Sequence, residues 1–128
     1  MQIIGRREPK AETQLRSLLH SSGLRFRKNL RPTPDLSCTA DIVFPKARVS
    51  VFVDGCFWHG CPLHFKVPSS HSQWWAEKVA DNRARDKRQT QALDARGWLV
   101  IRVWEHEDLA AAADQIRALV LARRARNP

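Results

Sequence analysis

Residues 41–54 read DIVFPKARVSVFVD, in which two apolar, mostly β-branched runs flank a short proline-containing turn. This pattern predicts an antiparallel β-hairpin. If the turn centres near residues 46 and 47, Asp41 lies opposite Phe52 or Val53 in the strand pairing. The hairpin then brings the acid that opens its first strand to the acidic end of its second strand.

The segments around the hairpin predict three helices and two further strands. AETQLRSLLHSSG (11–23) predicts a helix, LRFRKNL (24–30) an edge strand, and the stretch from about 74 to 96 a long helix ended by Gly97. The run WLVIRVW (98–104) lacks polar alternation, which predicts a strand covered on both faces. The last helix, from about 108 to 124, has a predicted apolar stripe of Leu109, Ala113, Ile116, Leu119 and Val120.

The resulting order, α-β-β-β-α-β-α, predicts an α/β fold of the α+β kind, with a mixed sheet and helices on both of its faces. A site is expected at a sheet edge, where strand ends diverge. The length of 128 residues and the hydrophobic content of 43% fit a single domain over residues 1–128.

Composition narrows the cellular context. The apolar runs are far shorter than the roughly 20 residues of a bilayer span, and charges stand where a signal peptide would be apolar. We therefore expect a soluble, intracellular protein with no membrane partner. Lys and Arg outnumber Asp and Glu by 22 to 13, a formal charge of +9. This charge favours a polyanionic partner, nucleic acid first, although a basic surface that only aids solubility has the same composition.

Three cysteines, an odd number, occur together with histidines, which indicates metal binding rather than disulfides. Cys56, Cys61 and His64 supply donors at local spacing, and His106 follows the last predicted strand. Four such donors suit a closed, tetrahedral and therefore structural zinc site. Cys38 is the expected bystander. The alternative is that Cys56 is a small buried apolar residue and that the histidines lie on the surface.

Asp41, Asp54, Glu12 and His59 are the candidates for catalysis. Carboxylates at diverging strand ends can hold a hard cation such as Mg²⁺, with water and substrate phosphate completing its coordination. A turn alone explains an Asp-Gly pair such as the one at Asp54, and the dipole at a helix start favours an acid such as Glu12 in any protein. Glu12 nevertheless shares a helix face with Leu15. His59 lies between two cysteines and is either a zinc ligand or a general base.

Asp86 and the Phe57-Trp58 pair each have two interpretations. Asp86 shares a stripe of the long helix with apolar residues such as Leu93, where it could orient His59, but an acid among basic neighbours is commonly a salt-bridged surface residue. Phe57 and Trp58 stand beside the candidate base, where exposed aromatics could act as a wedge between base steps of DNA. Core packing is the commoner role of such a pair.

The stretches FVDGCFWHGCPLHFKVP (52–68), WWAEKVADNRARDKR (74–88) and GWLVIRVWEHE (97–107) resemble the very short patch repair (Vsr) mismatch endonucleases, a branch of the PD-(D/E)xK nucleases. The resemblance implies a restriction-endonuclease-like αβββαβα core with a structural zinc site. It also implies a Mg²⁺-dependent nick in one strand of mismatched duplex DNA, in the parent family beside a thymine opposite guanine. We therefore expect a cytoplasmic, nucleoid-associated bacterial protein, with mismatch-repair helper proteins as candidate partners. A nickase needs one active site, so a monomer suffices.

The resemblance assigns roles to single residues. Asp41 matches a metal-binding aspartate and the Val53 carbonyl a backbone metal ligand. His59 matches the base that activates water, and Asp86 the acid that partners this histidine. Glu12 matches an acid on the first helix. The family's zinc ligands fall at or beside Cys56, Cys61, His64 and His106, its aromatic wedge at Phe57 and Trp58, and a third wedge residue at Met1. Further DNA contacts are expected from Lys66, Lys78, Asn82 and Arg83.

Three departures accompany the resemblance. Asp54 stands where the best-studied form has a histidine, so Asp54 is a candidate second Mg²⁺ ligand rather than a phosphate contact. The loop between Trp58 and Lys66 is shorter, and His106 replaces a cysteine. Almost nothing precedes Met1, so either the arm that helps to clasp DNA is missing or the chain start has been placed too late.

The predicted function is thus a DNA mismatch endonuclease whose Lys and Arg side chains bind the duplex backbone. One rival is a restriction-type nuclease that cuts both strands of specific or modified DNA. The other rival is a zinc-stabilised DNA-binding module without catalytic activity. The combination of Asp41, His59 and Asp86 argues against this last alternative.

Overall fold

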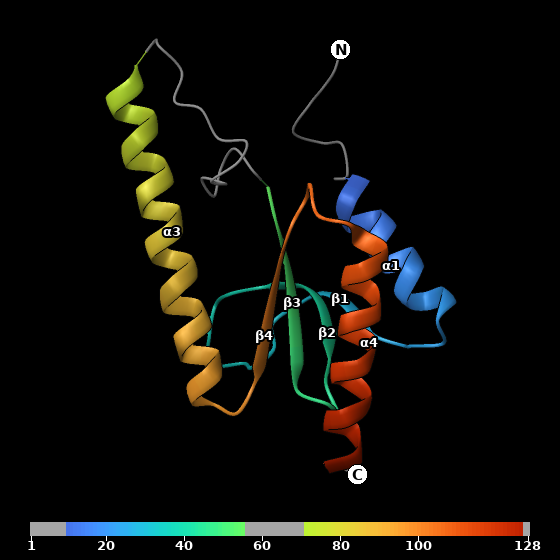
Figure 1. Cartoon of the computed structure of the whole chain (residues 1–128). Coiled ribbons are helices and arrows are strands. Elements are labelled where there is room, and N and C mark those ends of the chain that lie inside the picture. The colour runs from blue at the N-terminus through green and yellow to red at the C-terminus, as the bar shows by residue number, and fades with distance from the viewer. Residues whose placement is uncertain (1–9, 56–70, 127–128) are drawn as a thin grey trace.

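The computed structural model describes residues 10–55 and 71–126, which form three helices and a four-stranded mixed sheet (Figure 1). Figure 1 shows α3 on one face of the sheet and α1 and α4 on the other, so the predicted element order and layering are confirmed. The helices are α1 (Lys10–Ser21), α3 (Ser72–Ala95) and α4 (Leu109–Arg126), and the strands are β1 (Arg27–Leu30), β2 (Ala40–Phe44), β3 (Val49–Asp54) and β4 (Leu99–Trp104).

The register of the β2–β3 hairpin positions the candidate site. The two strands pair antiparallel with Ile42 opposite Val51. One step further along, this register sets Asp41 opposite Phe52, as predicted. β4 runs parallel to β3 along its whole length. The start of β2 and the ends of β3 and β4 therefore meet at one end of the sheet.

Backbone hydrogen bonds and dihedral angles form the predicted hairpin turn and the predicted end of α3. The Arg48 N–H donates to the Pro45 carbonyl at 3.2 Å, which makes residues 46 and 47 the centre of the hairpin turn. α3 ends before Gly97, whose φ of 84° lies in the left-handed region that glycine adopts without steric cost. The Trp98 N–H then donates to the Leu93 carbonyl at 3.0 Å, which satisfies one of the last carbonyls of α3.

The sheet separates two apolar clusters. One lies against α1 and α4 and includes Ile42 and Val51, and the other lies against α3 and includes Val43 and Phe52. Because neighbouring residues of a strand point to opposite faces, the apolar β2 and β3 contribute to both clusters. Leu93 of α3 is fully buried in the second cluster.

One detail of the sequence prediction is wrong. Leu119 is 42% exposed and is not part of the buried stripe of α4, which Ala112 joins instead. β4 lies at one edge of the described sheet and packs on both faces as predicted, with Leu99, Ile101 and Val103 against one cluster and Val100 against the other, although only Val103 is fully buried. β1 forms the opposite edge, as predicted. Among residues 10–55 and 71–126, no helix has the length and apolar character needed to cross a membrane.

Candidate active site

Asp41 stands just inside the start of β2 and contacts the end of β3. Its Oδ2 accepts a hydrogen bond of 2.7 Å from the Val53 backbone N–H. The antiparallel register creates this contact, and it confirms that Asp41 meets the strand end that carries Asp54. The described contact is with the Val53 amide, so the Val53 carbonyl as a metal ligand stays a prediction.

The surroundings of the Asp41 carboxyl disfavour its charged form. Burial away from water is the main reason why its pKa is raised from 3.8 to about 6. The neighbouring acids Glu12 and Asp54 raise this pKa further, whereas the Val53 hydrogen bond and the charge of Arg16 lower it. A cation brought beside Asp41 would relieve this unfavourable charge.

Glu12 faces inward from the first turn of α1. Its side chain forms a buried ion pair with Arg16, one turn further along the helix. Glu12 is 8% exposed and Leu15 is fully buried, so the predicted sharing of one inward face is confirmed. A favourable position in the helix dipole does not by itself require burial. Because its charge also raises the pKa of Asp41, Glu12 belongs to the acidic surroundings of Asp41.

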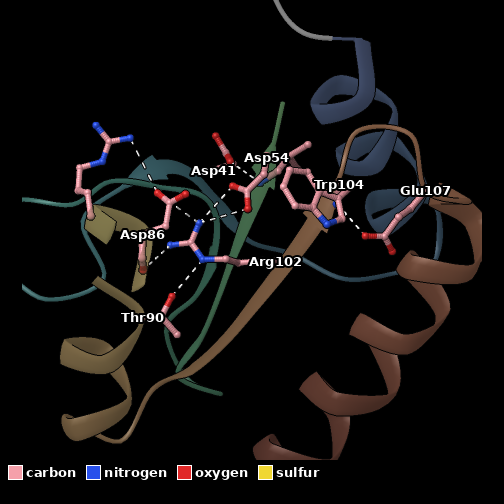
Figure 2. Close-up of polar contacts among 9 residues, drawn as sticks. Asp41, Asp54, Asp86, Thr90, Arg102, Trp104 and Glu107 are labelled. Atoms are coloured by element: carbon pink, nitrogen blue, oxygen red, sulfur yellow. Dashed lines mark hydrogen bonds and ion pairs between the residues drawn. The ribbon is translucent and has the colours of Figure 1, made fainter. Parts of the chain in front are cut away.

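Asp54 ends β3 and pairs with an arginine that the sequence analysis did not single out. Arg102 of β4 donates from Nη1 to the two carboxylate oxygens of Asp54 at 3.1 and 3.4 Å (Figure 2). Asp54 is 7% exposed. A signal for this pair was present in WLVIRVW, because a single charge inside an apolar strand needs a buried partner.

Asp86, on α3, belongs to the same cluster. Its carboxylate lies 3.8 Å from Arg102 Nη1 and 3.8 Å from Arg85 Nη2, and its backbone carbonyl accepts a hydrogen bond of 3.2 Å from Arg102 Nη2. The predicted salt bridge is thus present, but the Asp86 side chain is only 14% exposed. His59, the proposed partner of Asp86, lies outside the described residues.

These carboxylates line one pocket of about 360 Å³ between the sheet end and α3. Asp41, Asp54 and Asp86 contribute to its wall together with Arg102. Cys38, the expected bystander, is buried and lines the pocket as well. Within the described parts of the chain, no three His, Cys, Asp or Glu side chains form a group that could hold a metal ion by themselves.

The predicted zinc ligands lie mostly outside the described residues. Of the four, the structure describes His106, which follows β4, is exposed and stacks on Trp104 with ring centroids 6.4 Å apart. The zinc site therefore stays a prediction. The other predicted site residues outside the described ranges are Met1, Phe57, Trp58, His59 and Lys66, besides Cys56, Cys61 and His64.

The predicted DNA-binding residues of α3 lie in its N-terminal half. Lys78 and Arg83 are exposed, and Asn82 is half-buried. The Lys78 Nζ lies 5.6 Å from the centre of the Trp74 ring, and Trp74 is itself 49% exposed. This part of α3 thus presents positive charge and an aromatic surface, both of which suit contact with nucleic acid.

Carboxylates at strand ends, lining a pocket and accompanied by a basic helix, are typical of enzymes that hydrolyse phosphodiesters with a divalent cation. Comparison with known proteins agrees with this class of enzyme and narrows it to the DNA endonucleases. The family model described as DNA mismatch endonuclease Vsr matches residues 1–64. The chain belongs to this family, as the sequence resemblance predicted.

Individual relatives match along most of the chain. The type II nicking enzyme V.XorIIP of Xanthomonas oryzae pv. oryzae is 44% identical over 124 residues, which cover 94% of this chain and 88% of the relative. The type II nicking enzyme V.NaeI of Lentzea aerocolonigenes is 42% identical over 125 residues, with coverages of 93% and 75%. The DNA mismatch endonuclease Vsr of Escherichia coli is 39% identical over 107 residues, with coverages of 82% and 66%.

Proposed function

We propose that this chain nicks one strand of duplex DNA at or beside a base mismatch, in a Mg²⁺-dependent reaction that starts very short patch repair. Thymine opposite guanine, the mismatch of the parent family, is the first candidate. The observation that carries the proposal is the convergence of Asp41, Asp54 and Glu12 at one end of the sheet, where Glu12 and Asp54 help to raise the pKa of Asp41. Family membership supports the reaction class.

The donor chemistry of this sheet end fits a hard divalent cation, because carboxylate and carbonyl oxygens are the ligands that Mg²⁺ prefers. Asp41 and the Val53 carbonyl would hold the ion, with Asp54 as the candidate third ligand. A bound Mg²⁺ supplies stabilisation of the negative charge that develops on the scissile phosphate. Glu12 acts on Asp41 as a neighbouring negative charge that the paired Arg16 partly offsets.

His59 is proposed as the general base that takes a proton from the attacking water. The water oxygen then bonds to phosphorus as the bond from phosphorus to the leaving sugar oxygen breaks. Asp86 is proposed to hold the His59 ring in the orientation that this proton transfer needs. The support for Asp86 is its position on the pocket wall, where Arg102 fixes its backbone.

Substrate binding is proposed to use the basic surface and the aromatic residues. Lys66, Lys78, Asn82 and Arg83 would contact the DNA, while Phe57, Trp58 and Met1 probe for a weakly stacked base pair. Cys56, Cys61, His64 and His106 would hold a zinc ion that stabilises the fold. We propose that residues 1–128 form one restriction-endonuclease-like domain that acts as a monomer.

The names of the relatives favour nicking over the restriction-type alternative, since V.XorIIP and V.NaeI are both called nicking enzymes. The test is cleavage of strand-labelled duplexes that each carry a different mismatch, with and without Mg²⁺. Methylated and unmethylated perfect duplexes serve as controls. We expect one strand of a mismatched duplex to be cut, only with Mg²⁺, and a supercoiled plasmid with that mismatch to give open circles.

The variant Asp41→Ala separates catalysis from binding. It should abolish nicking while DNA affinity and zinc content remain as in the unmodified chain, because Asp41 is proposed to hold the catalytic cation only. Linear plasmid products would instead assign the restriction-type activity. A complete lack of Mg²⁺-dependent cleavage on every mismatched duplex would leave a binding module without catalysis.

A further inference from the structure

Arg102 of β4 has a partner for each nitrogen of its guanidinium group (Figure 2). Its Nε donates to Thr90 Oγ1 at 3.0 Å, its Nη1 to the Asp54 carboxylate at 3.1 Å, and its Nη2 to the Asp86 carbonyl at 3.2 Å. A planar group that donates in fixed directions satisfies such a set in one orientation. Arg102 therefore fixes β3 and α3 relative to each other at the pocket.

The Arg102 side chain is largely shielded from water. It is 22% exposed, and its Cζ lies 4.4 Å from the centre of the Phe52 ring, which is its direct neighbour in the β3–β4 register. An ion pair in such surroundings is stronger than one on the surface, because less water screens it. The loss of Arg102 would remove the cation that neutralises the buried Asp54.

The contacts of Arg102 fall where α3 has few apolar anchors. Val79 and Leu93 are the buried residues of α3, and Asp86 and Thr90 lie between them in the sequence. The hydrogen bonds from Arg102 thus attach the middle of α3 to the sheet. They do so at the point where Asp86 lines the pocket.

Two of the acids around Asp41 already have an arginine as their partner. Arg16 pairs with Glu12 and Arg102 pairs with Asp54, whereas a backbone N–H meets the carboxylate of Asp41. The two oxygens of Asp54 share one nitrogen of Arg102, Nη1, in a charge-assisted contact that orients the carboxylate toward Arg102. To coordinate a metal ion, Asp54 would have to give up part of this arrangement.

We propose that Arg102 is a positioning residue that keeps Asp54 as its ion-pair partner, outside the Mg²⁺ ligand set, and that sets Asp86 at the pocket. The inference rests on the proposed function, since the placement of Asp86 matters for the nicking reaction. With Asp54 left out, the metal ligands that this end of the sheet supplies are Asp41 and the Val53 carbonyl. Among the acids, Asp41 alone then binds the ion.

The test compares Arg102→Met, Arg102→Lys, Asp54→Asn and Asp41→Asn in two measurements. One is nicking of the mismatched duplex, with kcat and KM determined separately. The other is binding of Mn²⁺, used as a probe for the Mg²⁺ site and followed through the paramagnetic resonance signal of the free ion. Arg96→Met is the matched control, because Arg96 forms an exposed ion pair with Asp35 at the C-terminal end of α3 and does not line the pocket.

Arg102→Met should lower kcat by about 100-fold, the effect of a small misplacement of reacting groups, and change KM by less than about threefold. Arg102→Lys keeps the charge without the planar fork and should recover part of the loss. The double variant with Asp54→Asn should be no slower than Arg102→Met alone, because the two residues act as one unit. Asp41→Asn should weaken Mn²⁺ binding at least about tenfold, because it removes a ligand, and Asp54→Asn should weaken it clearly less, because Asp54 then acts on the ion only through its charge.

A loss of Mn²⁺ affinity in Asp54→Asn as large as that in Asp41→Asn would make Asp54 a ligand and overturn the inference, as would an unchanged kcat in Arg102→Met. If Arg102→Met does not fold, Arg102→Lys and Asp54→Asn give the same decision from kcat and Mn²⁺ affinity. If the unmodified chain nicks no duplex, the proposed function fails, whereas the Mn²⁺ measurements still decide between Asp41 and Asp54 as the ligand.

Discussion

Asp41 of β2 and Val53 of β3 are joined across the two strands: the Asp41 carboxylate accepts a hydrogen bond of 2.7 Å from the Val53 backbone N–H. This bond holds the acid at a place where burial and two neighbouring acids raise its pKa to about 6. At neutral pH the fold therefore maintains a carboxylate whose charge opposes stability. Such local destabilisation is common where a site needs a charged group for its function.

The first prediction concerns the stability of Asp41→Asn in Mg²⁺-free buffer. The folded chain keeps the Asp41 proton up to about pH 6, whereas the unfolded chain releases it near 3.8. The stabilisation that this proton provides is complete below the unfolded pKa and is lost as pH rises through the folded pKa. Asparagine cannot ionise but can still accept the Val53 hydrogen bond. Asp41→Asn should therefore be more stable than the unmodified chain above pH 6, by about 1 to 2 kcal/mol after allowance for solvent screening.

Urea unfolding at neutral pH and near the unfolded pKa measures this difference, which should shrink toward zero at the lower pH. Mg²⁺ should stabilise the unmodified chain more than the variant, because a ligand that binds only the folded state raises its stability. Equal stabilities at both pH values would show that the Asp41 carboxyl is not destabilised by burial.

The second prediction concerns the buried ion pair of α1. Arg16→Met leaves Glu12 charged, largely buried and beside Asp41, so the free energy of unfolding should fall by about 3 kcal/mol or more. The additional change Glu12→Gln removes the uncompensated charge and should restore much of the loss. Urea unfolding of the single and double variants tests this, and a loss below about 1 kcal/mol in Arg16→Met would place the pair among weak surface interactions.

The hairpin and the inward face of α1 were predictable because both depend on local periodicity. The turn at 46 and 47 fixed the register that sets Asp41 opposite Phe52, and helical spacing placed Glu12 with Leu15. Arg102 was missed because its role depends on α3, whose position over β4 is a tertiary property. The exposure of Leu119 was missed for a related reason: spacing gives the direction of a stripe, but the neighbouring elements decide its width.

The third prediction concerns the contribution of Lys78 to DNA binding. Lys78 is exposed on α3 beside Trp74, and a lysine that contacts phosphate strengthens binding by releasing counterions. Lys78→Met should weaken binding to mismatched and perfect duplexes alike and reduce the slope of log affinity against log salt by about 1. Fluorescence anisotropy over a range of salt concentrations measures both effects.

Lys46→Met is the control for this measurement, because Lys46 lies in the hairpin turn at the opposite end of β2 and β3 from the pocket. It should leave the salt slope unchanged. A loss of affinity in Lys78→Met that is confined to mismatched DNA would mean that Lys78 reads the mismatch and does not simply contact the backbone.

The last prediction concerns zinc. If Cys56, Cys61, His64 and His106 bind one ion, the purified chain should contain zinc, and Cys61→Ala should lose it. Structural zinc contributes about 10 kcal/mol or more in small domains, which is comparable to the whole stability of a folded domain, so Cys61→Ala should also unfold.

His106 tests the ligand that comes from the described part of the chain, since it follows β4 and is exposed. His106→Ala should lower zinc affinity, whereas His20→Ala, an exposed histidine at the end of α1, should not. Elemental analysis with thermal unfolding measures both properties, and a folded, active Cys61→Ala would exclude a structural role for the metal.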